Sequence, residues 1–165
     1  MNTPSDLSPS QIFLEAFRRH GAGIAVVTLL KADGTPSGFT ATSLASLSAN
    51  PPLATFNMSQ TASSYRSIKP GTSLLLHILR ADQVELAKKM AGEADQRFDG
   101  DHWSAGPDSL PLLTGVSSWL QATVVDVLEV EFSAAVAVRI TAGGLGDSGE
   151  ALVYQDRDYR RSTTL

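Results

Sequence analysis

The sequence predicts a mainly β fold: a six-stranded antiparallel Greek-key barrel with two or three flanking helices. Its 13 Gly and 8 Pro are scattered along 165 residues, which is typical of many turns between short strands. Several segments are apolar and β-branched, or alternate between apolar and polar residues, as strands do. Strands and helices do not alternate regularly, so a parallel sheet is not expected. The length predicts a single domain over residues 1–165 with its own core.

The first expected element is a helix that follows a polar tail, residues 1–9, which we expect to be disordered. Ser8 is a good N-cap, Pro9 suits the first helical position, and Gln11 completes a capping box. Apolar side chains then form one stripe, and Gly21 ends the helix. The stripe consists of Ile12, Phe13, Ala16 and Phe17.

Strands are expected in the next part of the chain. The first is β-branched and apolar, and Asp33-Gly34 after it marks a hairpin turn. The pair Pro51-Pro52 breaks the chain before a segment in which apolar and small or polar residues alternate. The expected strands cover residues 24–30, 38–44, 53–58 and 72–79, with a short helix at residues 63–68.

The second half is expected to hold one more helix and the longest strands. The helix starts at Asp82 and ends at Gly92, with Glu85 completing a capping box and pairing with Lys89 on the surface. Residues 94–114 have no periodic pattern and are expected to be irregular. The remaining strands cover residues 119–132, 135–141 and 151–154, with a flexible glycine-rich turn at residues 143–146.

Composition and missing motifs exclude several classes of protein. A net charge of −4 argues against a nucleic-acid partner, and the longest apolar stretch, residues 24–30, is too short to cross a membrane. Residues 1–10 lack the apolar segment of a secretory signal, so we expect a cytoplasmic protein. There is no Cys, and no two of the three His have the spacing of metal ligands. No nucleophile or phosphate-loop motif occurs, so we nominate no catalytic side chain and expect a cofactor to supply the chemistry.

The clearest chemical signal lies in residues 38–53, a hydroxyl-rich strand with small residues and an abrupt Pro-Pro exit. Small residues let a planar ring approach the backbone closely, so that peptide groups can meet its polar edge. Hydroxyls from Thr42, Ser43 and Ser48 can add hydrogen bonds without filling that space. An ordinary amphipathic strand followed by an edge loop is the alternative, and composition alone favours it.

The order and spacing of the motifs resemble those of the short-chain flavin reductases, which have the FMN-binding split barrel fold. Residues 40–53, TATSLASLSANPPL, resemble their T-A-N-S-F-x-S-x-S-x-x-P-P-L motif. Residues 17–28, FRRHGAGIAVVT, are similar to their F-R-x-x-x-x-G-V-x-V-V-T segment. Further similarities lie at residues 63–66, 97–98, 103, 111–113, 152–154 and 159. The resemblance therefore covers nearly the whole chain, residues 12–160, and implies a six-stranded split barrel that binds a flavin.

The resemblance also implies which residues bind the flavin. The ring is assigned to Thr40, Ala41, Thr42, Ser43, Leu44 and Ser48. The ribityl-phosphate side is assigned to Asn57, Ser59, Ser63 and Ser64, at the start of a short helix where Arg66 or Lys69 would add positive charge. Plain N-capping is the alternative role of the last two serines. His77, at a position that is usually Asn, and the loop of Arg97 and Phe98 complete the set; a surface Arg beside a core Phe is the alternative for that loop.

One motif of the family is missing. Flavin reductases usually carry a Gly-Asp-His triplet between their two long C-terminal strands, and its His lies near the nicotinamide. Here residues 130–136 read VEFSAAV, and Ser133 stands approximately where that His is expected. The loss leaves flavin binding untouched but removes a contact that would hold a nicotinamide for hydride transfer.

The leading functional hypothesis is an NAD(P)H:flavin oxidoreductase. The family implies that it binds FMN or FAD at the interface of a homodimer, takes a hydride from NADH or NADPH, and passes electrons to free flavin, oxygen or a monooxygenase component. The missing triplet favours an alternative, a flavin-binding electron carrier that uses no nicotinamide. A third hypothesis, a barrel that lost its cofactor and serves as an interaction protein, is disfavoured by the retained hydroxyl-rich motif. Neither nucleic acid nor a membrane is expected as a partner.

Overall fold

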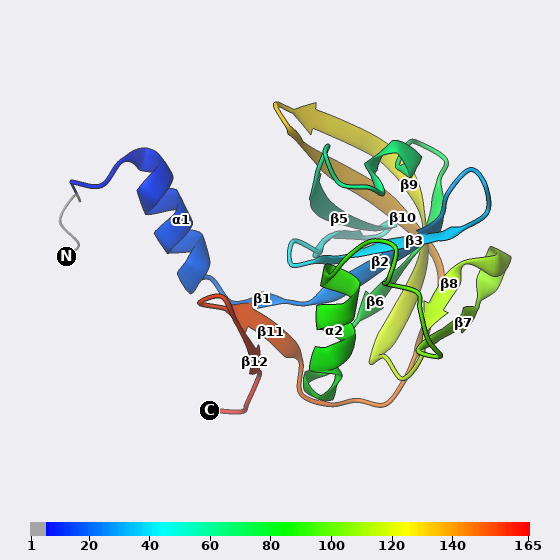
Figure 1. The fold of residues 1–165 in the computed structure, drawn as a ribbon. Coiled ribbons are helices and arrows are strands. Elements are labelled where there is room, and N and C mark those ends of the chain that lie inside the picture. The colour runs from blue at the N-terminus through cyan, green and yellow to red at the C-terminus, as the bar shows by residue number, and fades with distance from the viewer. Residues whose placement is uncertain (1–5) are drawn as a thin grey trace.

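The fold is built on one curled antiparallel sheet of seven strands (Figure 1). The computed structural model describes residues 6–165. Neighbouring strands follow the order β3-β2-β6-β9-β10-β5-β4. The strands are β2 Ala25–Leu30, β3 Pro36–Ala41, β4 Ala45–Ala49, β5 Pro52–Ser59, β6 Ser73–Ile78, β9 Ser118–Val130 and β10 Ser133–Leu145.

This strand order is that of a barrel with a gap, which confirms the predicted mainly β split barrel. β2 and β3 form one hairpin and β9 and β10 another, whereas β5 and β6 follow each other in the chain but do not pair. The two ends of the sheet meet across the core, where Phe39 of β3 packs against Phe56 of β5 with ring centroids 5.9 Å apart. Six strands therefore surround the core, and β4 is an additional short strand that pairs with β5 at the edge.

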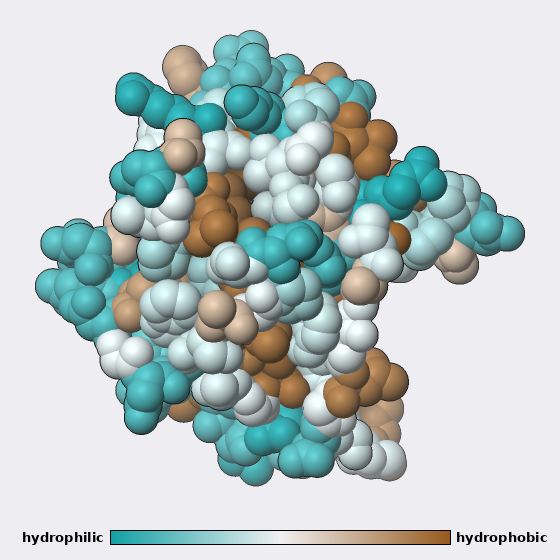
Figure 2. All heavy atoms as spheres, turned by 90° about the vertical axis from the view of Figure 1, so that its right-hand side faces the viewer, coloured by the Kyte–Doolittle hydropathy of each residue, from teal (hydrophilic) through white to brown (hydrophobic). Residues whose placement is uncertain are grey.

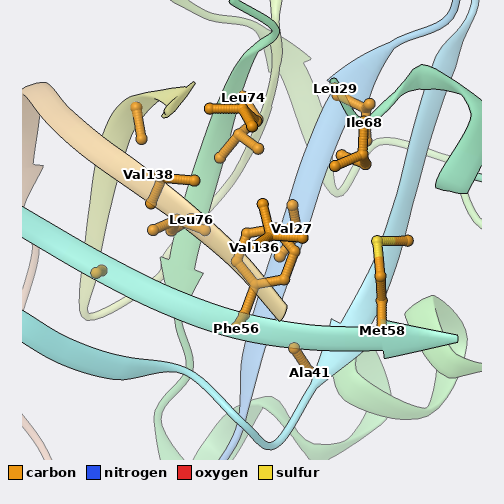
Figure 3. Packing of buried hydrophobic residues seen from close by; sticks show 13 residues of the cluster. Val27, Leu29, Ala41, Phe56, Met58, Ile68, Leu74, Leu76, Val136 and Val138 are labelled. Atoms are coloured by element: carbon orange, nitrogen blue, oxygen red, sulfur yellow. The ribbon is translucent and has the colours of Figure 1, made fainter. Parts of the chain in front are cut away.

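The main core lies inside the curl of the sheet (Figure 3). Alternate residues of each strand point inward, because successive side chains of a strand lie on opposite faces. Ile68, from the connection before β6, adds to this cluster. The inward residues include Val27, Leu29, Phe56, Met58, Leu74, Leu76, Val136 and Val138, each at most 7% exposed. This packing makes the barrel a rigid frame for the loops at its ends.

A second core cluster lies where helix α2, Val84–Ala91, covers the barrel. Ala87 and Met90 of α2 pack there with residues of β2 and of the later segments. The helix does not start as predicted, because a 3₁₀ turn, η2 Ala81–Gln83, comes first and the Arg80 amide donates to the Gln83 side chain at 3.0 Å.

The predicted ion pair of α2 is also wrong. The ammonium of Lys88, and not that of Lys89, lies 2.9 Å from the Glu85 carboxylate. Lys89 donates instead to the Asp99 carbonyl oxygen, which belongs to the loop after the helix. Helix α2 is thus held to that loop as well as to the barrel.

Two small sheets extend the barrel; the strand expected at residues 151–154 forms as β11, whereas the other four strands of these sheets were not predicted. β1 Ala22–Gly23, β11 Leu152–Gln155 and β12 Asp158–Arg161 form one, and β7 Trp103–Ala105 with β8 Pro111–Leu113 forms the other. Residues 94–114 are therefore not irregular throughout. On the side of the molecule that carries β7 and β8, hydrophobic residues lie in several separate areas among hydrophilic ones (Figure 2).

The glycine-rich segment 143–146 is not a flexible turn, because β10 continues to Leu145. A Cβ at Gly144 would lie 2.5 Å from Nε1 of Trp119, so this strand pair needs glycine in order to fit the indole. The predicted strand 38–44 likewise ends earlier, at Ala41. Only Tyr65–Ser67, a single 3₁₀ turn named η1, forms in place of the helix expected at 63–68. Residues 42–44 and most of residues 63–68 therefore form bends and turns where the sequence predicted a strand and a helix.

Helix α1, Pro9–Arg19, begins as predicted and stands apart from the barrel (Figure 1). The Gln11 amide donates to Oγ of Ser8 at 3.3 Å, and the Ser8 amide donates to Oε1 of Gln11 at 2.9 Å. Ser8 and Pro9, which the prediction placed in a disordered tail, thus cap and begin the helix; residues 1–5 lie outside the described part. No helix within residues 6–165 is long and apolar enough to span a bilayer.

Candidate functional site

The hydroxyl-rich segment makes a bend that connects the two ends of the sheet. β3 ends at Ala41 and β4 begins at Ala45, so Thr42, Ser43 and Leu44 cross from one edge to the other. Oγ of Ser43 accepts a hydrogen bond from the Asn57 amide at 2.8 Å and donates to the Asn57 carbonyl at 3.3 Å. The Ser43 hydroxyl therefore bonds the backbone amide and carbonyl of Asn57, as a paired strand would, and so holds the bend to β5 across the gap in the barrel.

A cleft of about 570 Å³ opens beside this bend, between α1 and the barrel. Its volume lies within the range of small-molecule sites, roughly 300–1,000 Å³. Three residues predicted from the resemblance, Thr42, Ser43 and Asn57, lie together on its wall. The other lining residues are Leu14, Phe17, Arg18, His20, Ala22, Tyr154, Gln155, Asp156 and Arg157.

The charged residues of the cleft come from α1 and from the turn of the β11–β12 hairpin. Arg18 lies 3.2 Å from the Glu15 carboxylate, and Asp156 lies 3.5 Å from the Arg160 guanidinium. Asp156 and Arg157 both have positive φ, 54° and 62°, as the two central residues of a tight hairpin turn require. This turn places the guanidinium-bearing residue Arg157 on the cleft wall, where a phosphate would find a positive group.

Helix α1 and the β11–β12 turn are parts of the cleft wall that were not predicted from sequence. Arg18 and Arg157 are far apart in the chain, and neither belongs to a motif that carries chemistry. A backbone contact brings them together, since the Asp156 amide donates to the Arg18 carbonyl at 2.7 Å. The similarities of residues 17–28, 152–154 and 159 to the family pointed toward this region without naming these two arginines.

The predicted phosphate-side residues divide into exposed and buried ones. Ser59 is exposed, and its hydroxyl lies 2.8 Å from that of Thr61; Ser63 is exposed as well. Ser64 is fully buried, and its Oγ lies 2.8 Å from Oγ of Ser37. Ser64 therefore stabilises the core and does not reach a ligand, which corrects its assignment to the phosphate.

His77 is a second correction, because it is fully buried on the face of β6 opposite to the inward-pointing Leu74 and Leu76, where β8 covers the barrel. Its Nδ1 lies 3.1 Å from the Val26 carbonyl, and its Nε2 accepts from the Leu113 amide at 3.2 Å. The imidazole is thus neutral, with the proton on Nδ1, and it joins β6 to β2 and β8. Burial lowers the pKa of His77 to about 4, against a hydrogen bond to Val26 that favours the charged form.

Arg97 and Phe98 also hold the structure together. Arg97 donates from Nε to the Gly92 carbonyl at 2.9 Å and from Nη1 to the Gly38 carbonyl at 2.6 Å. Phe98 packs edge-on against Trp103, with ring centroids 5.5 Å apart, at the border of the second core cluster. The alternative from sequence was a surface Arg beside a core Phe; here Arg97 is half-buried and bonded to two backbone carbonyls.

The remaining predicted ring residues lie around the bend but outside the cleft wall. Thr40 donates from Oγ1 to the Ala87 carbonyl at 3.2 Å, and Ala41 is buried. Leu44 packs against the main core, and Ser48 lies on β4 opposite Leu53. These residues shape the bend, whereas Thr42, Ser43 and Asn57 offer polar atoms to the cleft.

The hairpin between β9 and β10 is where the expected Gly-Asp-His triplet is missing. Val130 pairs with Ser133, so the turn consists of Glu131 and Phe132, and Phe132 is 78% exposed. Ser133 is the first residue of β10 and does not lie at the tip. An exposed aromatic ring therefore occupies the turn, beside the position that the sequence analysis assigned to the missing His.

The fold is that of a split-barrel protein with a cleft of small-molecule size, and comparisons with known proteins specify the family. The family model described as a flavin reductase like domain matches residues 17–163. The chain is 39% identical over 155 residues to an NADH:FMN oxidoreductase of Rhodococcus erythropolis, covering 91% of this chain and 80% of that protein. The chain belongs to the flavin reductase-like family.

Two further relatives agree with this assignment. The reductase component of a flavin-dependent trigonelline monooxygenase from Acinetobacter baylyi is 35% identical over 115 residues, which cover 70% of this chain and 37% of that protein. The crystal structure of a flavin reductase domain protein from Arthrobacter sp. FB24 superposes with a TM-score of 0.90 at 42% identity, covering 94% of this chain and 97% of that one. The barrel and its flanking elements are thus common to a protein of known structure.

The cleft residues fit a flavin nucleotide by size and by chemistry. The cleft has apolar walls from Leu14 and Phe17, which suit a flat heterocycle, and hydroxyl and amide groups that suit its polar edge. Arg18 and Arg157 supply positive charge for a phosphate. A second cleft of about 350 Å³, beside Arg80, contains none of the predicted residues. Among residues 6–165 no three His, Asp or Glu side chains gather as metal ligands would.

Proposed function

We propose that the protein is an NAD(P)H:flavin oxidoreductase that binds FMN or FAD in the cleft beside the 42–44 bend. The proposal is carried by one observation: in a chain of the flavin reductase-like family, Thr42, Ser43 and Asn57 line a cleft whose volume and charge suit a flavin nucleotide. Relatives are named as NADH:FMN oxidoreductase and as a monooxygenase reductase component, which supports a nicotinamide donor and an oxygenase acceptor.

The flavin would supply the redox chemistry, since its ring accepts a hydride and later returns the electrons. The protein's part is to bind and orient. Hydroxyls of Thr42 and Ser43 and the Asn57 amide would hold the polar edge of the ring, while Phe17 and Leu14 cover one apolar side. No acidic or basic side chain is needed to move a proton during hydride transfer, so we assign no catalytic residue. Ser59 and Ser63, both exposed, remain proposed contacts of the phosphate, and the cleft lining adds Arg157 to them.

We also propose that the protein acts as a homodimer and delivers reduced flavin to a monooxygenase component. Two exposed apolar surfaces, on α1 and on the β9–β10 hairpin, support a second copy as partner. Delivery to a separate oxygenase is supported by the open position of the cleft, which lies at the surface between α1 and the barrel. A flavin held there can exchange with solvent, as transfer to a second enzyme requires.

A binding titration with matched variants tests the site. Arg157→Gln removes a positive charge from the cleft wall, and Arg139→Gln removes one from an exposed position on β10 that does not line the cleft. Loss of one charge-assisted hydrogen bond, about 1.4 kcal/mol, corresponds to roughly tenfold weaker binding. We expect that loss for FMN with Arg157→Gln only. Equal affinities of the two variants, measured by fluorescence quenching of FMN, would argue against the assigned site.

The electron-carrier alternative is favoured by one observation, the Glu131-Phe132 turn that stands in place of Gly-Asp-His. Anaerobic addition of NADH, then NADPH, to the flavin-loaded protein separates the two functions. A reductase bleaches the absorption of oxidised flavin within seconds, whereas a carrier stays yellow until dithionite is added. Free FMN with the same nucleotide, without protein, is the control for uncatalysed reduction.

A further inference from the structure

A second cleft, with a volume of about 350 Å³, lies between the β7–β8 sheet and the end of β10. It shares no lining residue with the cleft proposed for the flavin. Trp119 of β9 lines it, and the indole lies over Gly144 of β10, where a Cβ would be 2.5 Å from Nε1. Leu112 and Val116 add apolar side chains to the lining. The volume and the aromatic and aliphatic lining are those of a small-molecule site.

Two hydrogen-bond donors of this cleft have no acceptor within residues 6–165: the indole N–H of Trp119 and Nη1 of Arg80. Nε and Nη2 of Arg80 donate to the Asp82 carboxylate at 3.1 and 3.0 Å, whereas Nη1 lies 3.9 Å from the Asp147 carboxylate, too far for a hydrogen bond. The Arg80 side chain is only 19% exposed, so water shields its charge little. In the described part of the chain every buried side-chain nitrogen has a partner, so these two donors are accessible to solvent and a ligand can reach them.

Leu145, the last residue of β10, lines the cleft although it is 90% exposed. The segment that follows it is fixed on both sides. The Gly146 amide donates to the Ser117 carbonyl at 2.8 Å, and the Ala81 amide donates to the Glu150 carbonyl at 2.8 Å. This segment runs along one end of the barrel, past the start of α2, to β11 (Figure 1). An apolar side chain is therefore held at the cleft while it is almost entirely in water, and an apolar ligand would cover it.

These groups suit an aromatic ring that carries a carboxylate. The ring suits Trp119 and Leu145, because it removes apolar surface of both side chains from water. The carboxylate suits Nη1 of Arg80, since a guanidinium binds carboxylates through charge-assisted hydrogen bonds. Asp147 has to turn away, which costs little because its side chain is 96% exposed and has no hydrogen-bond partner within residues 6–165. Arg80 would repel a cationic ligand, and a neutral ligand would gain less from it.

We propose that this cleft binds a small aromatic carboxylate, with its ring against Trp119 and Leu145 and its carboxylate on Nη1 of Arg80. The ligand replaces Asp147 beside the guanidinium, while Asp82 keeps its two hydrogen bonds to Nε and Nη2. Because the two clefts have no residue in common, this site is independent of the proposed function.

Titration of the full chain with benzoate, followed by NMR, tests the site. The chain has two Trp, and their indole N–H signals report on different places: Trp103 donates to the Phe98 carbonyl at 2.8 Å, whereas Trp119 lines the cleft. We expect benzoate to shift the Trp119 signal with a Kd of about 1 mM and to shift that of Trp103 far less. Benzamide, which is neutral and of the same shape, should bind about tenfold more weakly because it lacks the charge-assisted bond to Arg80. An unshifted Trp119 signal at about 10 mM benzoate, or equal binding of the two probes, overturns the proposal.

Three variants at exposed positions locate the ligand without disturbing the core. Leu145→Ser should weaken benzoate binding about fivefold, and Asp147→Asn should tighten it about threefold by removing the competing carboxylate. Asp95→Asn, in the exposed loop after α2, removes a charge that does not line the cleft and is the matched control with unchanged binding. Unchanged binding by Leu145→Ser, or weaker binding by Asp147→Asn, contradicts the proposal. Release of benzoate by FMN would place the probe in the flavin cleft and overturn this site, whereas FMN affinity measured without benzoate reports separately on the proposed function.

Discussion

Stability between pH 7 and pH 5 should depend on one buried side chain, His77. The ring is fully buried, and its burial lowers the pKa to about 4 from 6.5. In this pH window the unfolded chain binds a proton at His77 and the folded chain does not, so lowering the pH favours unfolding. One pH unit corresponds to at most about 1.4 kcal/mol. The contribution of His77 to stability should therefore fall by about 2 kcal/mol between pH 7 and pH 5, and by about 3 kcal/mol once the pH reaches 4.

Comparison with His77→Asn isolates this effect from all other titrating groups. Asn does not titrate, and its side-chain amide can take the place of Nδ1 as the donor to the Val26 carbonyl. It is too short to replace Nε2 as the acceptor of the Leu113 amide, a loss that does not depend on pH. Urea unfolding followed by the fluorescence of Trp103 and Trp119 gives the free energy of unfolding of both proteins at pH 7, 6 and 5. We expect the difference between them to change by about 2 kcal/mol over this range. Parallel curves would refute the claim that His77 is neutral and buried in the folded state.

Three other substitutions test the packing that frames the site. Ser64→Ala leaves the buried Ser37 hydroxyl without its partner at 2.8 Å. The free energy of unfolding should fall by about 1–2 kcal/mol, with no change in FMN affinity. Weaker FMN binding would show that Ser64 does contribute to the flavin site. Gly38→Ala places a Cβ 2.7 Å from the Val27 carbonyl oxygen and should cost about 1–3 kcal/mol in urea unfolding, so an unchanged midpoint would contradict the close approach. Phe56→Ala empties the centre of the main core and should cost about 3–5 kcal/mol, seen as a lower melting temperature, whereas a smaller loss means that the core collapses around the gap.

Elements with strong local signals were predictable from sequence. The capping box of Ser8 and Gln11 forms as expected, because capping depends on residues three positions apart. The β2–β3 hairpin forms around Gly34, whose φ of 81° suits glycine. The strands β7 and β8 were missed, since three residues are too few to show a periodic pattern. Short strands of this kind depend on what they pack against, which a local pattern does not contain.

Contacts between segments that are distant in sequence limit how much of the candidate site could be predicted. The two partners of the His77 ring, at Val26 and Leu113, lie 51 and 36 residues away, so its structural role could not be seen from its neighbours. The hydroxyl-rich segment already indicated Thr42 and Ser43 as candidate hydrogen-bonding residues, but only the resemblance to the family assigned them, with Asn57, to a flavin. Arg157 joins them only because the barrel and the last hairpin fold together. Composition alone would have left the hydroxyl-rich segment as an ordinary strand and loop.

Gln60 connects the loop after β5 to the tip of the β9–β10 hairpin, so ligand binding at one can affect the other. Its backbone amide donates to the Phe132 carbonyl at 2.9 Å, and its side chain donates to the carbonyls of Glu131 and Ser133 at 3.0 and 2.9 Å. The loop that bears Ser59 is thus fastened to the hairpin tip and cannot shift without it. A bound nucleotide that reduces the mobility of this loop would also reduce the mobility of the hairpin tip. By the same coupling, a change that destabilises the tip would weaken binding of the nucleotide. The stability of the proposed homodimer and the affinity for the flavin would then be coupled, because the hydrogen bonds of Gln60 connect the hairpin tip to the loop.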